Sequence, residues 1–254
     1  MSTITTPAVV PAAGSLARRT GPSFPSLTGL EIRKSLSTRS GKSVAALAVA
    51  VGPLGVLLAT LTSGAGAVPA AVAIGIMGML VALVLLSLGV LSSAGEWTHK
   101  SVQTTYLLVP QRGRVLAAKA AAMGLLGFVL AGLGIGLTTA TMAVFAPNVV
   151  WFAATQAVIA VIASGAAFAV IGAGIGAALG NSAAAMTATY LTLLGILPVV
   201  SSVKPEIAEK LDPAASIQTL AQHGAAATPI LVIAGWVVVS TIAGIVVTRR
   251  RSVA

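Results

Sequence analysis

The chain alternates between long apolar stretches without charge and short polar stretches. A helix needs about 20 predominantly apolar residues to cross the hydrocarbon core of a bilayer. Six stretches meet this requirement, at residues 43–63, 68–92, 120–145, 149–179, 183–203 and 225–247. The pattern therefore predicts an all-α integral membrane protein with six transmembrane helices.

Two details of this pattern concern the second half of the chain. The fourth stretch is longer than a span requires, so we expect it to tilt or to begin outside the hydrocarbon, and only "GNS" at 180–182 separates it from the fifth. Residues 204–224 then predict two short helices, each with proline at its first position. Asp212 is the expected N-cap of the second helix and Gly224 its end. The alternative is a simple surface loop.

The composition supports a membrane protein. The 254 residues are 57% hydrophobic and 8% charged, whereas soluble domains carry about 25% charged residues. The chain contains no cysteine, which excludes disulfides and thiol chemistry. The net charge of +10 comes from basic residues beside the apolar stretches, a distribution typical of membrane loops rather than of nucleic-acid binding.

The distribution of lysine and arginine predicts the orientation, because cytoplasmic loops are enriched in them. With both termini in the cytoplasm, the opposite side holds only Lys204 and Lys210. The cytoplasmic side then holds Arg18, Arg19, Arg33, Lys34, Arg39, Lys42, Lys100, Arg112, Arg114, Lys119, Arg249, Arg250 and Arg251. The predicted regions are a disordered tail (1–25), a juxtamembrane or elbow segment (26–42), the transmembrane domain (43–247, including the external loop 204–224) and a basic tail (248–254).

The predicted spans contain no acidic residue, lysine, arginine or histidine. Such residues inside spans usually mark proton relays, so their absence argues against a proton-coupled carrier, although sodium coupling through carbonyls and hydroxyls stays possible. Glu96 and His99 form a lone E-x-x-H without a third ligand, and the remaining histidine, His223, also lies outside the spans. The sequence thus predicts neither a catalytic site nor a metal or cofactor site.

Glycines are spaced for close helix packing in the third and fourth stretches. Small residues four positions apart let helix backbones approach each other in a membrane. This spacing joins Gly132 to Gly136, and Gly172 to Gly176 and Gly180, so we expect the third and fourth spans to pack closely. "GAGIGAALG" departs from a dinucleotide fingerprint at Ala177, and "STRSGKS" lacks the first glycine of a phosphate loop, so the chain is not expected to hydrolyse ATP itself.

The polar residues between the second and third stretches form a coupling segment, residues 95–114. Glu96 and Lys100 are spaced for an i,i+4 ion pair, and Trp97 and Tyr106 suit the membrane interface. We expect a short cytoplasmic helix that ends at Pro110, and a Lys119 side chain that extends to the headgroups.

This segment carries a family resemblance. The order of residues is an acid after span two, hydroxyl residues, a proline, basic residues and a lysine that opens span three. In this chain they are Glu96, Ser101, Thr104, Thr105, Pro110, Arg112, Arg114 and Lys119. Together with "GLEIRKSLSTRSGKS" ahead of the first span, the chain resembles the permease subunits of type-2 ATP-binding-cassette (ABC) exporters, especially small actinobacterial ones.

The resemblance implies a homodimer of six-span subunits in the plasma membrane, with two cytoplasmic ABC ATPases that bind ATP and Mg²⁺. The permease itself would then be neither an enzyme nor a cofactor-binding protein. The neutral, apolar spans favour an amphiphilic or hydrophobic substrate over an ion. The resemblance also implies a contact with the ATPase, made by Glu96, Trp97, Lys100, Ser101, Thr104, Thr105, Tyr106 and Arg112.

Two other functions stay open from the residues alone. One is an ion-coupled carrier or passive channel with a path lined by serine and threonine. The other is a membrane anchor or sensor that recruits a cytoplasmic partner through the coupling segment and moves no solute.

Overall fold

A computed structural model describes residues 22–63, 68–98, 112–146 and 148–251. It confirms the all-α prediction, because six helical stretches are long and apolar enough to cross a membrane. The spans are α2 (Arg39–Ser63), α3 (Ala70–Thr98), α5 (Arg112–Phe145), α6 (Ala154–Leu179), a fifth built from α7 (Ser182–Tyr190), η1 (Leu191–Ile196) and α8 (Leu197–Val203), and α11 (Ala227–Arg250).

The centre of the bundle is the pair formed by α3 and α6, which share the most extensive helix–helix contact. Glycine permits this close approach. A Cβ atom at Gly172 would overlap the carbonyl oxygen of Leu86, and one at Gly176 would lie 2.7 Å from the carbonyl oxygen of Val90. Phe168, fully buried, adds bulk beside these contacts. α5 and α11 pack on α6, and α2 packs on α5 and α3.

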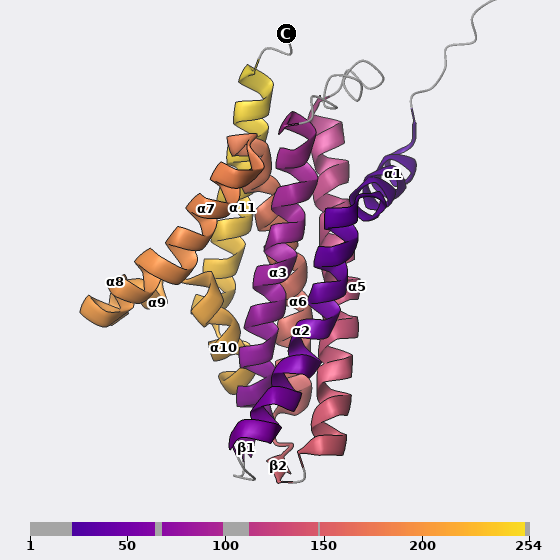
Figure 1. Ribbon diagram of the computed structural model, residues 1–254. Helices are drawn as coiled ribbons and strands as arrows, with labels where there is room; N and C mark the ends of the chain where they lie inside the picture. The colour runs from indigo at the N-terminus through magenta and orange to yellow at the C-terminus, as the bar shows by residue number, and fades with distance from the viewer. Residues whose placement is uncertain (1–21, 64–67, 99–111, 147, 252–254) are drawn as a thin grey trace, which may run out of the picture.

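A short helix precedes the first span. α1 (Phe24–Ser37) begins after Ser23, whose hydroxyl accepts a hydrogen bond from the Ser26 amide, and ends at the extended residue Thr38. Figure 1 shows α1 projecting from the bundle at the end of α2. The side of α1 that carries Leu27 is buried, and α1 contacts α5, α2 and α3.

Both ends of the chain's described part lie at one end of the bundle. Figure 1 shows α1 and the last turn of α11 at this end, and the short strands β1 (Val68–Pro69) and β2 (Val149–Val150) at the other. We call the first the basic end, because the turns of α1, α2, α5 and α11 that carry lysine and arginine lie there. That the basic end faces the cytoplasm stays a prediction.

The segment before the sixth span folds as the sequence predicts. α9 (Pro205–Glu209) and α10 (Pro213–His223) both begin with proline, and the Asp212 carboxylate caps α10 by accepting hydrogen bonds from two backbone amides at 2.8 and 3.1 Å. Gly224 ends α10 at φ 77°. The alternative of a simple surface loop is wrong for α10, because Ile217 and Ala221 are fully buried and the helix packs on α3, α6 and α11.

The fifth span diverges from the bundle. Figure 1 shows α7 beside the other spans and α8 far from them. Gly180 (φ 64°) ends α6 and the Asn181 side chain caps α7, which confirms the predicted division. Tyr190 attaches the end of α7 to α3, since its hydroxyl lies 2.5 Å from the Ser87 hydroxyl and donates to the Leu83 carbonyl at 2.8 Å. The π-helical turn η1 follows directly.

Candidate functional site

Four charged side chains meet at the basic end of the bundle and form a cluster, which we call the charge cluster. It consists of Glu31 and Lys34 of α1, Glu96 of α3 and Lys119 of α5. Lys119 pairs with Glu31 and lies 3.1 Å from Glu96, while Lys34 pairs with Glu96 and lies 2.9 Å from Glu31. Each lysine therefore contacts both carboxylates, and the cluster is neutral as a whole.

Helical spacing brings the four groups together. On α1, Glu31 and Lys34 are three residues apart and so lie on neighbouring positions of one face. Glu96 occupies the last turns of α3 and Lys119 the early turns of α5. A hydroxyl contact supports the same junction, because Ser35 of α1 and Ser92 of α3 are hydrogen-bonded at 2.9 Å.

Burial makes the charge cluster strong. Glu31 is 4% exposed and Lys119 is 7% exposed. An unpaired charge at such a depth costs several kcal/mol, whereas a paired and hydrogen-bonded one is tolerated. Lys119 meets this condition, since its ammonium group also lies 3.4 Å from the Ser92 carbonyl oxygen. Separating any one of the three helices would leave a buried charge without its partner, at a cost of several kcal/mol. The charge cluster therefore holds the three helices together.

The pKa values of the two α1 residues reflect these contacts. Burial alone would raise the pKa of Glu31, but the positive charges of Lys119 and Lys34 outweigh it and hold the pKa below its usual value. Burial alone would lower the pKa of Lys34, but Glu96 and Glu31 outweigh it and raise the pKa. Both residues are therefore charged at neutral pH.

A second junction at the basic end involves the last residue of the described chain. The Arg251 guanidinium donates hydrogen bonds to the carbonyl oxygens of Ala178 and Leu179 at 2.9 and 3.0 Å, where α6 ends. It also lies 5.0 Å from the ring centroid of Trp97 at the end of α3, within the range of a cation–π interaction. Arg251 thus links α11, α6 and α3.

The chemistry of this end is that of a mechanical junction. No group of three or more histidine, cysteine or acidic residues capable of holding a metal ion occurs in the part of the chain that the structure describes. The charge cluster itself consists of mutually neutralised groups that are already paired. Its evident capacity is to fix the positions of α1, α3 and α5 relative to one another.

No protein-family model and no curated protein matches this chain. The resemblance to exporter permeases therefore depends on the coupling segment with Lys119 and on residues 29–43 ahead of the first span.

The structure describes part of that segment. Glu96 and Trp97 belong to the last turns of α3, which continues to Thr98, and Arg112 begins α5. The other expected contact residues lie outside the described residues: Lys100, Ser101, Thr104, Thr105 and Tyr106. The predicted helix up to Pro110 and the predicted pair of Glu96 with Lys100 fall there too and stay predictions.

One expectation at this end is wrong. Lys119 does not extend to the headgroups, because its ammonium group turns into the bundle toward Glu31 and Glu96. The hydropathy pattern places the start of the third span after Lys119, whereas α5 begins at Arg112. The physical reason is that Glu31 and Glu96, from two other helices, pair with Lys119 inside the bundle. The hydropathy of one stretch contains no information about such partners.

The glycines selected from the sequence have different surroundings. Gly172 and Gly176 touch the backbone of α3, the second span, rather than that of the third. Gly180 lies against the Arg251 guanidinium. A Cβ atom on Gly132 would have a single described neighbour, a side-chain atom 4.0 Å away, and one on Gly136 would have no described neighbour within 4 Å.

The third and fourth spans do approach each other closely, but at a different pair of glycines. A Cβ atom on Gly127 would lie 2.7 Å from the carbonyl oxygen of Gly165. The expected contact between these spans is therefore present, and the glycines that make it are Gly127 and Gly165.

Sequence reasoning missed Glu31 and Lys34 as site residues. A signal was present, because Glu31 is the only acid among the first 95 residues and stands three positions before a lysine. An isolated acid in a basic segment beside a membrane suggests a specific partner. Its partners on α3 and α5 could not be read from the sequence.

Proposed function

We propose that this chain is the membrane-spanning permease subunit of an ABC exporter, which moves an amphiphilic or hydrophobic substrate across the plasma membrane. In this proposal a separate ABC ATPase binds ATP and Mg²⁺ and supplies the energy, two permease subunits form a homodimer, and the basic end faces the cytoplasm. The observation that carries the proposal is the charge cluster, which joins Glu96, at the start of the coupling segment, to α1 and α5.

The distribution of charge along the spans supports an external energy source. Within the six spans, every charged residue lies in the first turns of α2 and α5 or in the last turns of α3 and α11, all at the basic end. The middle of the bundle therefore offers no acidic or basic side chain for a proton relay. Work applied at the basic end is the simplest way to drive such a bundle through a cycle.

The charge cluster is suited to passing such work between helices. A push on the end of α3 moves Glu96, and Glu96 is paired with a lysine on α1 and with a lysine on α5. Separating these groups would expose unpaired charges to an apolar environment, at a cost of several kcal/mol. The three helices consequently move as one unit, and a force on the coupling segment reaches α2, which follows α1 after the short break at Thr38.

The test is co-expression with an ABC ATPase subunit, followed by ATP hydrolysis and transport in proteoliposomes. We expect hydrolysis to be stimulated by the permease, and Lys100→Glu or Tyr106→Ala to abolish the stimulation without changing the thermal unfolding midpoint. Lys204→Glu is the matched control. Lys204 directly precedes α9, on the side of the membrane predicted to hold few cations, and this variant should retain the stimulation of ATP hydrolysis.

Each other result identifies a different function. Uphill solute movement by the purified chain without nucleotide or ATPase would establish an ion-coupled carrier in place of the proposal. Binding of a cytoplasmic protein through the coupling segment, with no solute movement under any condition, would establish an anchor or sensor.

A further inference from the structure

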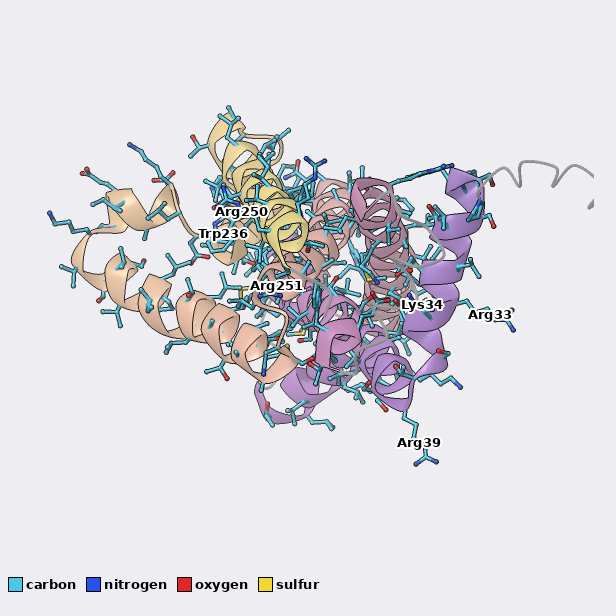
Figure 2. All side chains as sticks on the ribbon, turned by 90° about the horizontal axis from the view of Figure 1, so that it is seen from above. Arg33, Lys34, Arg39, Trp236, Arg250 and Arg251 are labelled. Carbon is cyan, nitrogen blue, oxygen red and sulfur yellow. The ribbon has the colours of Figure 1, made fainter. Side chains whose placement is uncertain are left out.

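The junction of α1 and α2 carries cations that the charge cluster does not neutralise. Arg33 of α1 and Arg39 and Lys42 of α2 are exposed, and none forms an ion pair within the described residues. Figure 2 shows Arg33 and Arg39 pointing away from the bundle, whereas Lys34 points into it. The outer side of this junction is therefore positively charged and would attract an anionic surface.

Among the described residues, no acidic side chain is left to neutralise these cations. The chain has five acids, and three of them, Glu206, Glu209 and Asp212, lie in or beside α9, which Figure 1 shows on the side of the bundle away from α1. The remaining two, Glu31 and Glu96, are both engaged by lysines in the charge cluster. A counter-charge for the three outer cations has to come from another molecule.

The depth of the cations identifies that molecule as a lipid. Leu47, Leu54 and Leu58 of α2 are exposed, and on a membrane span an exposed apolar side faces hydrocarbon. Arg39 precedes Leu47 by eight residues, which is about 12 Å along a helix. Arg39 and Lys42 therefore both lie on the headgroup side of these leucines, where lysine and arginine are enriched.

α1 carries the same combination of an exposed leucine and an exposed cation. Its outer side carries Leu30, which is 51% exposed, and Arg33 three residues later. An exposed leucine next to an exposed arginine is the pattern of a helix that lies in the interface, with the apolar group in the acyl region and the cation on a phosphate. Glu31 lies on the side of the same helix opposite Arg33, and it enters the charge cluster together with the neighbouring Lys34.

We propose that the outer side of the α1–α2 junction, formed by Arg33, Arg39 and Lys42, binds the headgroups of anionic phospholipids. Because α1 has the lipid contact on one side and the charge cluster on the other, bound lipid holds α1 against α3 and α5. Anionic lipid therefore stabilises the folded chain, and it does so whether or not the chain belongs to an ABC exporter.

The experiment uses the full chain purified in an uncharged detergent. Phosphatidylglycerol, phosphatidylcholine and inorganic phosphate are titrated separately, and the thermal unfolding midpoint is measured. We expect phosphatidylglycerol to raise the midpoint more than phosphatidylcholine, and phosphate alone to have little effect. In the triple variant Arg33→Gln, Arg39→Gln, Lys42→Gln, the phosphatidylglycerol concentration for half-maximal stabilisation should rise at least about tenfold, since each basic residue near an anionic surface contributes severalfold in affinity.

The matched control is Lys204→Gln with Lys210→Gln, which removes cations from the segment around α9 and should leave the response unchanged. Single Arg33→Gln, Arg39→Gln and Lys42→Gln variants should each weaken the response severalfold, and they serve if the triple variant does not fold.

Three results would overturn the proposal. They are equal stabilisation by both lipids, an unchanged response in the triple and single variants, and a full response to phosphate alone, which would indicate a small-anion site. None of these measurements includes an ATPase, so a negative outcome leaves the proposed transport function intact. Loss of a protein partner from the triple variant with an unchanged lipid response would assign the cations to that partner instead.

Discussion

Lys119 of α5 pairs with Glu31 of α1, which precedes it by 88 residues, and both side chains are buried at the basic end of the bundle. The pair closes a neutral cluster with Lys34 and Glu96. It joins a helix that lies outside the predicted membrane spans to two helices that form part of them.

Removing one partner from this cluster should destabilise the fold. Lys119→Met keeps a long side chain but leaves the Glu31 carboxylate with Lys34 as its remaining cationic partner among the described residues. We expect the free energy of unfolding to fall by about 3 kcal/mol, as for other buried pairs that lose one member. Denaturant unfolding of the purified protein measures the change, with Lys42→Met as control because Lys42 is exposed.

The double variant Lys119→Met, Glu31→Gln makes this prediction sharper. Because the second substitution removes the uncompensated carboxylate, we expect it to recover part of the lost stability. Losses that simply add would show that the two residues do not interact, and an equal loss in Lys42→Met would show a general effect of removing lysine.

The stability should depend on pH through the α1 residues. The pKa of Glu31 is lowered from its usual value of 4.5, so the stability that it contributes is present above pH 4.5 and is lost as the pH falls through its lower folded-state pKa. The pKa of Lys34 is raised from 10.5, so its contribution is present below pH 10.5 and is lost as the pH rises through its higher folded-state pKa.

Thermal unfolding midpoints between pH 3 and pH 8 test the acid side. We expect the wild-type midpoint to fall steeply below about pH 4.5, and Glu31→Gln to start lower at neutral pH and to fall less steeply. Parallel curves for the two proteins would mean that other groups cause the acid transition. Glu209→Gln, outside the cluster, is the control and should follow the wild type.

The sequence was sufficient for the features that depend on local patterns. Each span is a run of apolar residues, and the ends of α10 follow from Pro213 and Gly224, whose preferences act within one turn. The division between the fourth and fifth spans likewise follows from Gly180 and Asn181.

Features that depend on pairing between distant helices were not predictable. Glu96 was expected in a cytoplasmic helix and Lys119 at the headgroups, because both lie beyond the apolar stretches, whereas each is held inside the bundle by charges from other helices. The glycine spacing indicated close packing, but not which neighbour Gly172 would meet. A single sequence gives the property of a residue, whereas its partner depends on how the helices are arranged in space.

Adding a single methyl group between α3 and α6 should be costly. In Gly172→Ala the new Cβ atom would overlap the Leu86 carbonyl oxygen, which belongs to a rigid helix backbone and cannot rotate away. We expect a loss of about 1–3 kcal/mol, typical of overpacked cores. Denaturant unfolding measures it. Gly136→Ala is the matched control, since no described atom lies within 4 Å of its Cβ position and alanine is the better helix former. Equal losses of stability in the two variants would refute the contact between Gly172 and Leu86.

The link between Arg251 and Trp97 should be measurable as a coupling energy. Arg251→Ala removes two charge-assisted hydrogen bonds to the end of α6 and the contact with the Trp97 ring, so we expect a loss of about 1.5–3 kcal/mol. Trp97→Leu removes the ring contact and leaves the hydrogen bonds from Arg251 to α6 in place. Because the double variant loses that contact once rather than twice, its destabilisation should be smaller than the sum of the single ones by about 0.5–1 kcal/mol.

Arg250→Ala is the control, because its side chain is exposed, and it should change stability by less than about 0.5 kcal/mol. Strictly additive single and double variants would show that the guanidinium only caps α6 and that the ends of α3 and α11 are not joined through it.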